Sequence, residues 1–252
     1  IELVSDLTFN SVFPEQEIGK EVEVIIDEIH SYEDTPSELI YDEFENILFE
    51  DSQIGHNILG DESFLLKFNS DKAKSFIDKY YIPSNIVFFS LGKTNFKKVI
   101  YYVEKYLNDI SSKILSDNKR IEPIDIKTII KREEKDTTQA HAIIGCRSYS
   151  LYNPNRKILN LLSNILGGPG MNSRLNISLR EKRGYVYNVD SSITSYTDTG
   201  MASVYFGCDK KNLNKCIDLV NKELKKLKDE KLTTSQLHLA KKQYIVPQKY
   251  CI

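Results

Sequence analysis

Two glutamates, Glu21 and Glu28, are spaced so that their carboxylates could serve one metal ion. Residues 14–32 have the pattern of an amphipathic helix, whose apolar stripe spans about 60° and is formed by Ile18, Val22, Ile25 and Ile29. Positions seven residues apart are nearly eclipsed two turns along a helix, so both carboxylates border the same edge of that stripe. Carboxylate oxygens bind zinc, and a zinc ligand is usually supported by a hydrogen-bonded neighbour. Taken alone, the spacing is more typical of the solvated shoulder of an ordinary surface helix, and it also fits a metal ligand with a supporting acid.

A zinc site would also need nitrogen or sulfur ligands, and histidine is scarce in this chain. The four histidines are His30, His56, His141 and His238. His30 follows Glu28 by two residues, so the two side chains lie roughly 160–200° apart around the helix and face away from each other. Residues 30–34 (HSYED) imitate a His-x-x-Glu-His motif but end in aspartate, and we interpret them as a coincidence. Surface or satisfied core positions are the default expectation for the other three.

The hydrophobic periodicity and the helix caps predict the elements that must position these side chains. In the first half we expect helices over residues 14–32, 36–49, 70–81 and 94–108, with a short apolar strand over residues 86–91. The polar segment 111–126 lacks periodicity and is expected to be a linker. In the second half we expect strands over 128–131, 140–147, 186–196 and 201–208, and helices over 153–166, 173–183, 213–228 and 234–246. This order favours an antiparallel or mixed sheet with helices on one face.

Composition narrows the classes of function. The 34 Lys and Arg balance 36 Asp and Glu, for a formal net charge of -2, so the basic excess used to bind nucleic acid is lacking. No apolar run approaches the roughly 18 residues of a membrane span, and none is expected. The four cysteines form no C-x-x-C pair and favour a reducing compartment, so we expect a cytoplasmic protein.

Several sequence motifs in the chain resemble those of the insulinase/pitrilysin family of zinc metallopeptidases, in particular of proteins like the mitochondrial processing peptidases. The motifs are PEQEIGKEVEVIIDEI (14–29), YDEF (41–44), GHNILG (55–60), GGPGMNSRL (167–175), LREKRGYVYNV (179–189) and SYTDTG (195–200). They follow one another in the family's order and cover nearly the whole chain. These peptidases are inverted zincins, which carry a His-x-x-Glu-His motif.

The resemblance assigns roles to four residues. Glu28 matches the family's third zinc ligand, and Glu21 matches the acid two turns earlier that supports it. Arg180 and Tyr187 match the pair that binds the substrate backbone and helps to stabilise the developing oxyanion; a guanidinium and a phenol can both donate hydrogen bonds to such an oxygen. Without the resemblance, Arg180 reads as an exposed helix residue. Tyr187 would then read as a packing residue, because it alternates with Tyr185, Val189 and Ile193 on one strand face.

The family's two histidine ligands and its catalytic glutamate are absent from these 252 residues. A lone Glu28 cannot hold catalytic zinc, which normally has three protein ligands. We therefore expect a fragment, cut at both ends, that by itself holds no stoichiometric zinc and hydrolyses no peptide.

The resemblance implies an α+β protein with two related ferredoxin-like domains, whose helices pack on mixed or antiparallel sheets. The boundaries we predict are residues 1–110 for the zinc-bearing domain, 111–126 for the linker and 127–252 for the second domain, with both domains truncated. The full-length protein would be a zinc-dependent metalloendopeptidase that cleaves peptides or unfolded segments in an enclosed chamber, and Glu28 with the Arg180 and Tyr187 pair in one chain suggests a homodimer. The alternative is a catalytically silent partner or structural subunit of the same family, paired with a sister subunit.

Overall fold

The computed structural model describes residues 1–50, 52–108, 110 and 128–248, with side chains up to residue 245. The chain divides into two compact units. The first consists of Ile1–Ser31 and Ile58–Lys119, and the second of Tyr32–Asn57 and Arg120–Ile252. The domain boundary predicted within residues 111–126 lies outside the described residues and stays a prediction.

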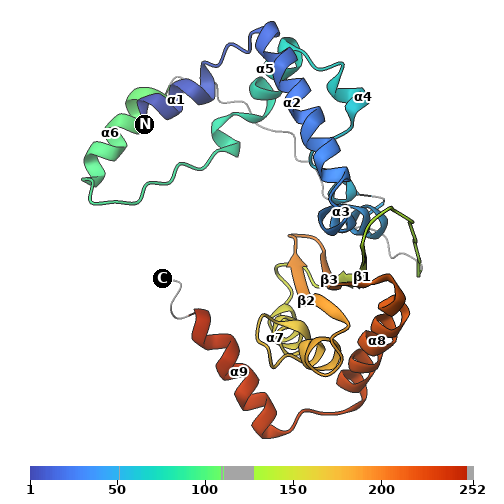
Figure 1. Ribbon diagram of the computed structural model, residues 1–252. Helices are drawn as coiled ribbons and strands as arrows, with labels where there is room; N and C mark the ends of the chain where they lie inside the picture. The colour runs from blue at the N-terminus through green and yellow to red at the C-terminus, as the bar shows by residue number, and fades with distance from the viewer. Residues whose placement is uncertain (51, 109, 111–127, 249–252) are drawn as a thin grey trace. The chain divides into compact units, whose positions relative to one another are not determined.

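The described part of the first unit is helical (Figure 1). It contains α1 (Glu2–Phe9), most of α2 (Glu15–Glu33), α4 (Glu62–Leu65), α5 (Ser70–Tyr80), η2 (Pro83–Asn85) and α6 (Phe96–Leu107). The helices predicted over 14–32, 70–81 and 94–108 are confirmed as α2, α5 and α6. The capping residues are Asn69 and Asn95, whose side chains accept from the backbone N–H groups of Lys72 and Lys97. Among the described residues, no helix is both long and apolar enough to cross a bilayer.

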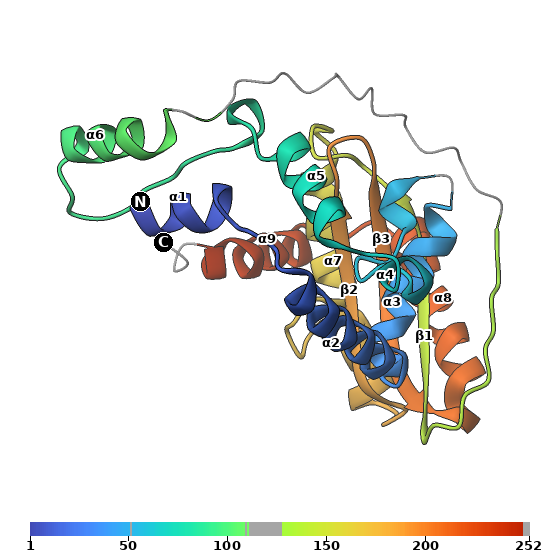
Figure 2. The ribbon, with the colours of Figure 1, turned by 90° about the horizontal axis from the view of Figure 1, so that it is seen from above.

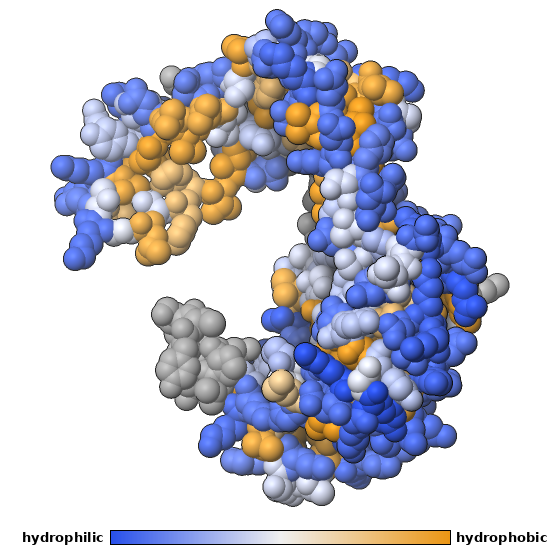
Figure 3. All heavy atoms as spheres, viewed as in Figure 1, coloured by the Kyte–Doolittle hydropathy of each residue, from blue (hydrophilic) through white to orange (hydrophobic). Residues whose placement is uncertain are grey.

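The strand predicted over residues 86–91 does not form. The segment runs without regular structure, and Val87 and Leu91 are 91% and 89% exposed. A β-strand is stable only when a neighbouring strand completes its hydrogen bonds, and the described residues of the first unit supply none. Figure 3 shows apolar side chains gathered on the surface of this unit. The strand expected in the first half was therefore wrong for the described residues.

The second unit is built on an antiparallel sheet of three described strands. These are β1 (Gln139–Ser148), β2 (Val186–Ser195) and β3 (Gly200–Asp209), in the order β1-β3-β2. Three of the four strands predicted in the second half are thus confirmed, whereas residues 128–131 form no strand. The remaining elements of this unit are α3 (Pro36–Leu48), η1 (Gln53–Gly55), α7 (Arg156–Gly167), η3 (Asn176–Glu181), η4 (Lys210–Asn212), α8 (Leu213–Asp229) and α9 (Thr234–Gln248). The α+β class with an antiparallel sheet is confirmed, while the pair of related ferredoxin-like domains stays a prediction.

The two faces of this sheet differ in chemistry. One face packs on α7, η3 and α8, and its core holds Phe206, Cys208, Leu175, Leu179, Cys216 and Val220, all completely buried. On the other face lies α3, as Figure 2 shows. The tyrosine rings of Tyr41 and Tyr205 there are 5.1 Å apart, and Arg147 donates from Nε (3.0 Å) and Nη2 (2.7 Å) to the Leu48 carbonyl that ends α3. A cation at a helix C-terminus satisfies an otherwise unpaired carbonyl and complements the helix dipole.

A polar cluster lies on the α3 face of the sheet. Nδ1 of His141 and the Tyr205 hydroxyl are 2.9 Å apart, and Asp190 stands directly opposite Tyr205 in the β2–β3 pairing. Burial raises the pKa values of Asp190 and Tyr205 and lowers the pKa of His141. The surroundings therefore disfavour the charged form of each of these three groups.

The connection from η3 to β2 is a tight reversal set by one glycine. The six residues of η3 form a π-helical turn, which is wider than an α-helical turn and frequent at functional sites. It is closed by hydrogen bonds from Gly184 N–H to the Arg180 carbonyl (2.8 Å) and from Tyr185 N–H to the Leu179 carbonyl (2.9 Å). Gly184 has φ +61°, the left-handed region in which a side chain is strained. The reversal therefore fixes the path from Arg180 to the start of β2.

Replacing Gly184 should weaken this reversal. A Cβ at this position would meet no atom within 4 Å, so the cost of Gly184→Ala is conformational, about 1–2 kcal/mol of unfolding free energy. Gly19→Ala is the matched control, because Gly19 lies inside α2 with equal space and ordinary helical geometry, and it should stabilise by about 0.5–1 kcal/mol. Urea unfolding followed by circular dichroism measures both. Stabilisation by Gly184→Ala would contradict the left-handed reversal.

Replacing the half-buried acid Asp190 should change how stability depends on pH. Because burial raises the pKa of Asp190 above its ordinary 3.8, the ionised carboxylate opposes folding at neutral pH. Asp190→Asn should therefore raise the unfolding free energy at pH 7 by roughly 1 kcal/mol, and this gain should vanish once the pH falls below both pKa values. Denaturant unfolding from pH 3 to 8 tests this, with the exposed Asp218→Asn as the control. An Asp190→Asn variant that is less stable than the wild type at pH 7 would contradict the raised pKa of Asp190.

Candidate functional site

Tyr187 occupies a β-bulge at the start of β2. In the β2–β3 pairing Val186 lies opposite Cys208 and Asn188 opposite Gly207, which leaves Tyr187 as the extra residue. A bulge of this kind re-aims a side chain and is frequent beside active sites. Val186 and Val189 are buried, whereas Tyr187 is 57% exposed. The packing interpretation of Tyr187, based on strict alternation with Tyr185, Val189 and Ile193, was wrong because the extra residue shifts the alternation.

The phenol of Tyr187 is held by an acid at the end of the neighbouring strand. Its hydroxyl donates to Oδ1 of Asp209 at 2.9 Å, and Nζ of Lys211 lies 3.7 Å from Oδ2 of the same carboxylate. The hydrogen bond to Asp209, and then the charge of Asp209, raise the pKa of Tyr187. The phenol therefore keeps its proton and has a fixed direction while remaining accessible to solvent.

Arg180 lies in the last turn of η3, on the other side of the reversal at Gly184. Its neighbours Ser178 and Leu179 are buried, while Arg180 itself is exposed. Nη1 of Arg183 donates to the Ser178 carbonyl at 2.6 Å and so satisfies a backbone group of the π-helical turn. The backbone of Arg180 is thus anchored, and its exposed side chain can meet a ligand. A guanidinium and a phenol so presented suit a peptide backbone, which offers both carbonyl and N–H groups.

The two predicted metal-site acids lie on α2 in the first unit. Glu21 and Glu28 are both exposed, and Val22 is the buried residue of the helix. Glu21 lines a hollow of about 440 Å³ formed by α1, the start of α2 and the segment between them, and Glu28 is not part of its lining. The geometry leaves open both interpretations of this pair, because an acid at the edge of a helix can serve a metal or simply face water.

The residues described here do not fit a zinc ion by themselves. Among residues 1–50, 52–108, 110 and 128–248, no group of three or more His, Cys, Asp or Glu side chains could hold a metal ion. Nε2 of His30 lies 3.9 Å from Oε2 of Glu62, and both side chains are exposed. Among the described residues no third possible metal ligand lies beside them. Glu28 can supply one carboxylate ligand, and a catalytic zinc needs three protein ligands.

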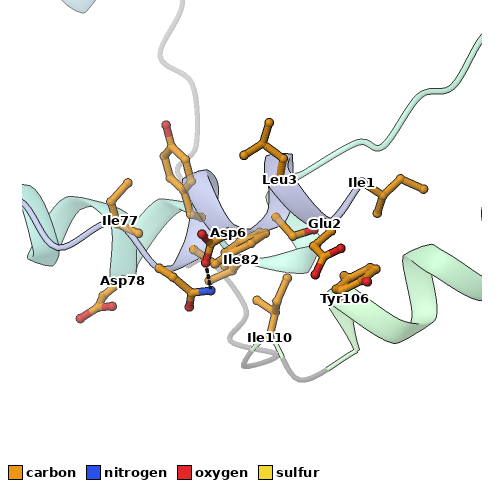
Figure 4. A pocket seen from close by; sticks show the side chains of 13 residues that line it. Ile1, Glu2, Leu3, Asp6, Ile77, Asp78, Ile82, Tyr106 and Ile110 are labelled. Atoms are coloured by element: carbon orange, nitrogen blue, oxygen red, sulfur yellow. Dashed lines mark hydrogen bonds between the residues drawn. The ribbon is translucent and has the colours of Figure 1, made fainter.

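A larger hollow in the first unit is lined by apolar side chains and three carboxylates, those of Glu2, Asp6 and Asp78. It measures about 1040 Å³ and lies between α1, the end of α5 with the two residues that follow it, and the end of α6 (Figure 4). Ile77, Ile82 and Tyr106 supply much of its apolar wall, and Nδ2 of Asn10 donates to Oδ1 of Asp6 at 2.9 Å on its rim. Its lining contains no histidine, cysteine, lysine or arginine. We therefore assign no catalytic or metal site to it.

Sequence reasoning missed Asp209, the hydrogen-bond partner of Tyr187. Nothing in the phrase YFGCD (205–209) marks this acid, since its role depends on the register between two strands. The bulge did leave a signal. Val186 and Val189, the buried residues that flank it, are three positions apart, whereas uninterrupted alternation separates buried positions by two.

Comparisons with known proteins agree with this fold. The sequence profile described as "Peptidase M16 inactive domain" matches residues 67–244. The chain is 30% identical over 243 residues to "Uncharacterized zinc protease YmxG" of Bacillus subtilis, covering 96% of this chain and 58% of that protein. It is 31% identical over 225 residues to an "Uncharacterized zinc protease" of Rickettsia felis, covering 89% of this chain and 53% of that protein. The chain thus spans little more than half the length of these relatives.

Two solved structures have the same fold. One is the peptidase M16 inactive domain from Pseudomonas fluorescens, with a TM-score of 0.88, 20% identity, and coverage of 96% of this chain and 58% of that one. Another is a protease from Helicobacter pylori, with a TM-score of 0.79, 20% identity, and coverage of 98% of this chain and 61% of that one. The profile match, the curated relatives and the shared fold together show that the chain belongs to the peptidase M16 family, in agreement with its resemblance to insulinase-type zinc peptidases.

Proposed function

We propose that this chain is the substrate-binding part of a zinc-dependent endopeptidase that acts on peptides or unfolded polypeptide segments. The observation that carries the proposal is the bulge at Tyr187, which presents an exposed, oriented phenol one short reversal away from the exposed Arg180. Both groups can hydrogen-bond to the main chain of a peptide, which suits binding with little dependence on side-chain sequence. The relatives named zinc proteases support the reaction class.

The metal belongs to the full-length protein in this proposal. Glu28 would supply one ligand and Glu21 would support it, while the two histidines and the catalytic glutamate would come from sequence outside these 252 residues. A zinc ion so held would supply Lewis-acid polarisation of the scissile carbonyl and an activated water. The contribution of the described residues is to bind and orient the peptide through Arg180 and Tyr187, which would act in an enclosed chamber formed with a second copy or a sister subunit.

A second candidate is a catalytically silent partner subunit that binds peptides without cleaving them. The matching profile is described as an inactive domain, which is compatible with this candidate as well as with the first. The same Arg180 and Tyr187 surface would serve this role, because peptide binding needs no metal. The two candidates differ in whether the full-length protein holds zinc and hydrolyses peptide.

Peptide hydrolysis by the full-length protein tests the proposal. Glu28→Gln should lower zinc content and reduce hydrolysis by about 100-fold or more, because it removes a metal ligand. Arg180→Ala and Tyr187→Phe should lower kcat/KM by roughly 10- to 100-fold with zinc content unchanged. Glu23→Gln, an exposed acid on the same helix, is the matched control.

The outcomes separate the candidates. Hydrolysis that survives chelation, or full activity of Glu28→Gln, would contradict the zinc peptidase. Peptide binding that Arg180→Ala weakens, with no hydrolysis under any metal condition, would establish the silent partner. For the 252-residue chain alone we predict no stoichiometric zinc and no hydrolysis, and one tightly held zinc per chain in metal analysis would overturn that prediction.

A further inference from the structure

Helix α3 meets the sheet along one stripe of side chains, and that stripe contains an acid. Tyr41, Phe44 and Leu48 recur at helical spacing and pack on the sheet. Glu45 follows Tyr41 by four residues and lies on the same stripe, where its Oε1 accepts a hydrogen bond from the Tyr196 hydroxyl at 3.4 Å. A carboxyl group therefore lies inside an interface that consists mainly of rings and apolar side chains.

Two more acids border this interface. Asp190 of β2 stands directly opposite Tyr205, whose ring packs against Tyr41 of α3. Burial and then the charge of Asp190 raise the pKa of Tyr41, so this acid faces the helix. Asp42 precedes Glu45 by three residues, and all three acids are half-buried. Three acids therefore share the contact between α3 and the sheet.

The cations near α3 are bound to other groups. Lys131 pairs with Glu43 of α3, and Arg147 of β1 donates to the Leu48 carbonyl. None of the three acids forms an ion pair with a residue that the structure describes. Their negative charge is therefore not balanced by an ion pair within the interface.

The docked helix favours the neutral form of these acids. Burial raises the pKa values of Asp42, Glu45 and Asp190. The charge of Glu43 adds to this effect for Asp42, and the charge of Asp42 adds to it for Glu45, which the hydrogen bond from Tyr196 partly offsets. A carboxylate regains water when α3 leaves the sheet, so ionisation favours the undocked helix.

His141 responds to pH in the opposite direction. Its Nδ1 lies 2.9 Å from the Tyr205 hydroxyl on the α3 face of the sheet, and burial lowers its pKa. A protonated ring would bring a charge into the interface, and Nδ1 could no longer accept a hydrogen bond. Docking of α3 is therefore favoured by a neutral histidine as well as by neutral acids.

We propose that α3 is a pH-dependent latch on the sheet, which loosens as Asp42, Glu45 and Asp190 ionise and again when His141 gains a proton. The stabilisation from the acids is complete below their ordinary pKa values, 3.8 for aspartate and 4.5 for glutamate, and is lost as the pH rises through the raised values. The stabilisation from the neutral histidine is complete above its ordinary pKa of 6.5 and is lost as the pH falls through the lowered value. The latch is a property of the fold and does not depend on the proposed peptidase activity.

Hydrogen exchange followed by mass spectrometry reports how often α3 opens. Peptides from residues 36–48 and 213–229 are compared at pH 4.5 and pH 8, with each rate corrected for the intrinsic exchange rate at that pH. Because α8 packs on the opposite face of the sheet, its peptides report unfolding of the unit as a whole. In the wild type at pH 8, α3 should be protected at least about 10-fold less than α8. Equal protection would overturn the latch, because α3 would then open only when the unit unfolds.

Variants identify the groups that loosen the helix. Glu45→Gln combined with Asp190→Asn keeps the hydrogen-bonding capacity of both side chains and removes their charges. This double variant should raise the protection of α3 at pH 8 by roughly 10-fold, the effect of one unit of pKa shift, and change it little at pH 4.5. Each single substitution should give part of this gain, and Glu38→Gln, an exposed acid on the same helix, should give none.

The histidine is tested at the other end of the pH range. His141→Gln should raise the protection of α3 at pH 4.5 and not at pH 8, because the glutamine amide can accept from Tyr205 and cannot become charged. Unchanged protection of α3 at pH 8 in the double acid variant would overturn the proposal. An equal gain of that variant at both pH values would also overturn it, since the gain would then not depend on ionisation.

Discussion

The extra residue in β2 is the constraint on which the candidate site depends. Because Val186 pairs with Cys208 and Asn188 pairs with Gly207, Tyr187 has no pairing partner in β3. Its ring is turned out of the core while the valines on either side remain buried. The hydrogen bond to Asp209 follows from this register, since a one-residue change in the pairing would move the side chain to the other face of the sheet.

The segment before β2 determines where Arg180 lies and how the chain enters the strand. The π-helical turn at η3 buries Leu179 and leaves Arg180 exposed, and Gly184 reverses the chain in a conformation that other residues adopt at a cost. The apolar face of the sheet, packed on α7, η3 and α8, makes the strands rigid enough to hold a hydrogen-bonded pair at their ends. On the opposite face α3 closes over Tyr205, with Arg147 bound to its last carbonyl. The site therefore rests on the buried core of the sheet.

Much of this fold follows from local sequence, and the failures have physical causes. Helical periodicity located α2, α5, α6 and α8 to within a few residues, because each buries one stripe of apolar side chains. Residues 86–91 have strand composition but form no strand, since a strand also needs partners that composition cannot supply.

The candidate site was predictable only in part. Arg180 and Tyr187 were singled out by their resemblance to a family, while the bulge and Asp209 depend on contacts across the sheet that a single strand does not encode. Glu21 and Glu28 lie at exposed positions of α2, as the helical periodicity predicts. The periodicity of one helix does not indicate which residues of other segments could bind the same metal ion.

The most direct test of this account is the register of β2 against β3 in solution. Nuclear Overhauser contacts between α-protons of facing residues report which residues pair across an antiparallel sheet. The account predicts a contact from Asn188 to Gly207, pairing of Val186 with Cys208, and no facing residue for Tyr187. An uninterrupted ladder in which Tyr187 pairs directly with a residue of β3, and Asn188 with the residue before it, would contradict the central claim.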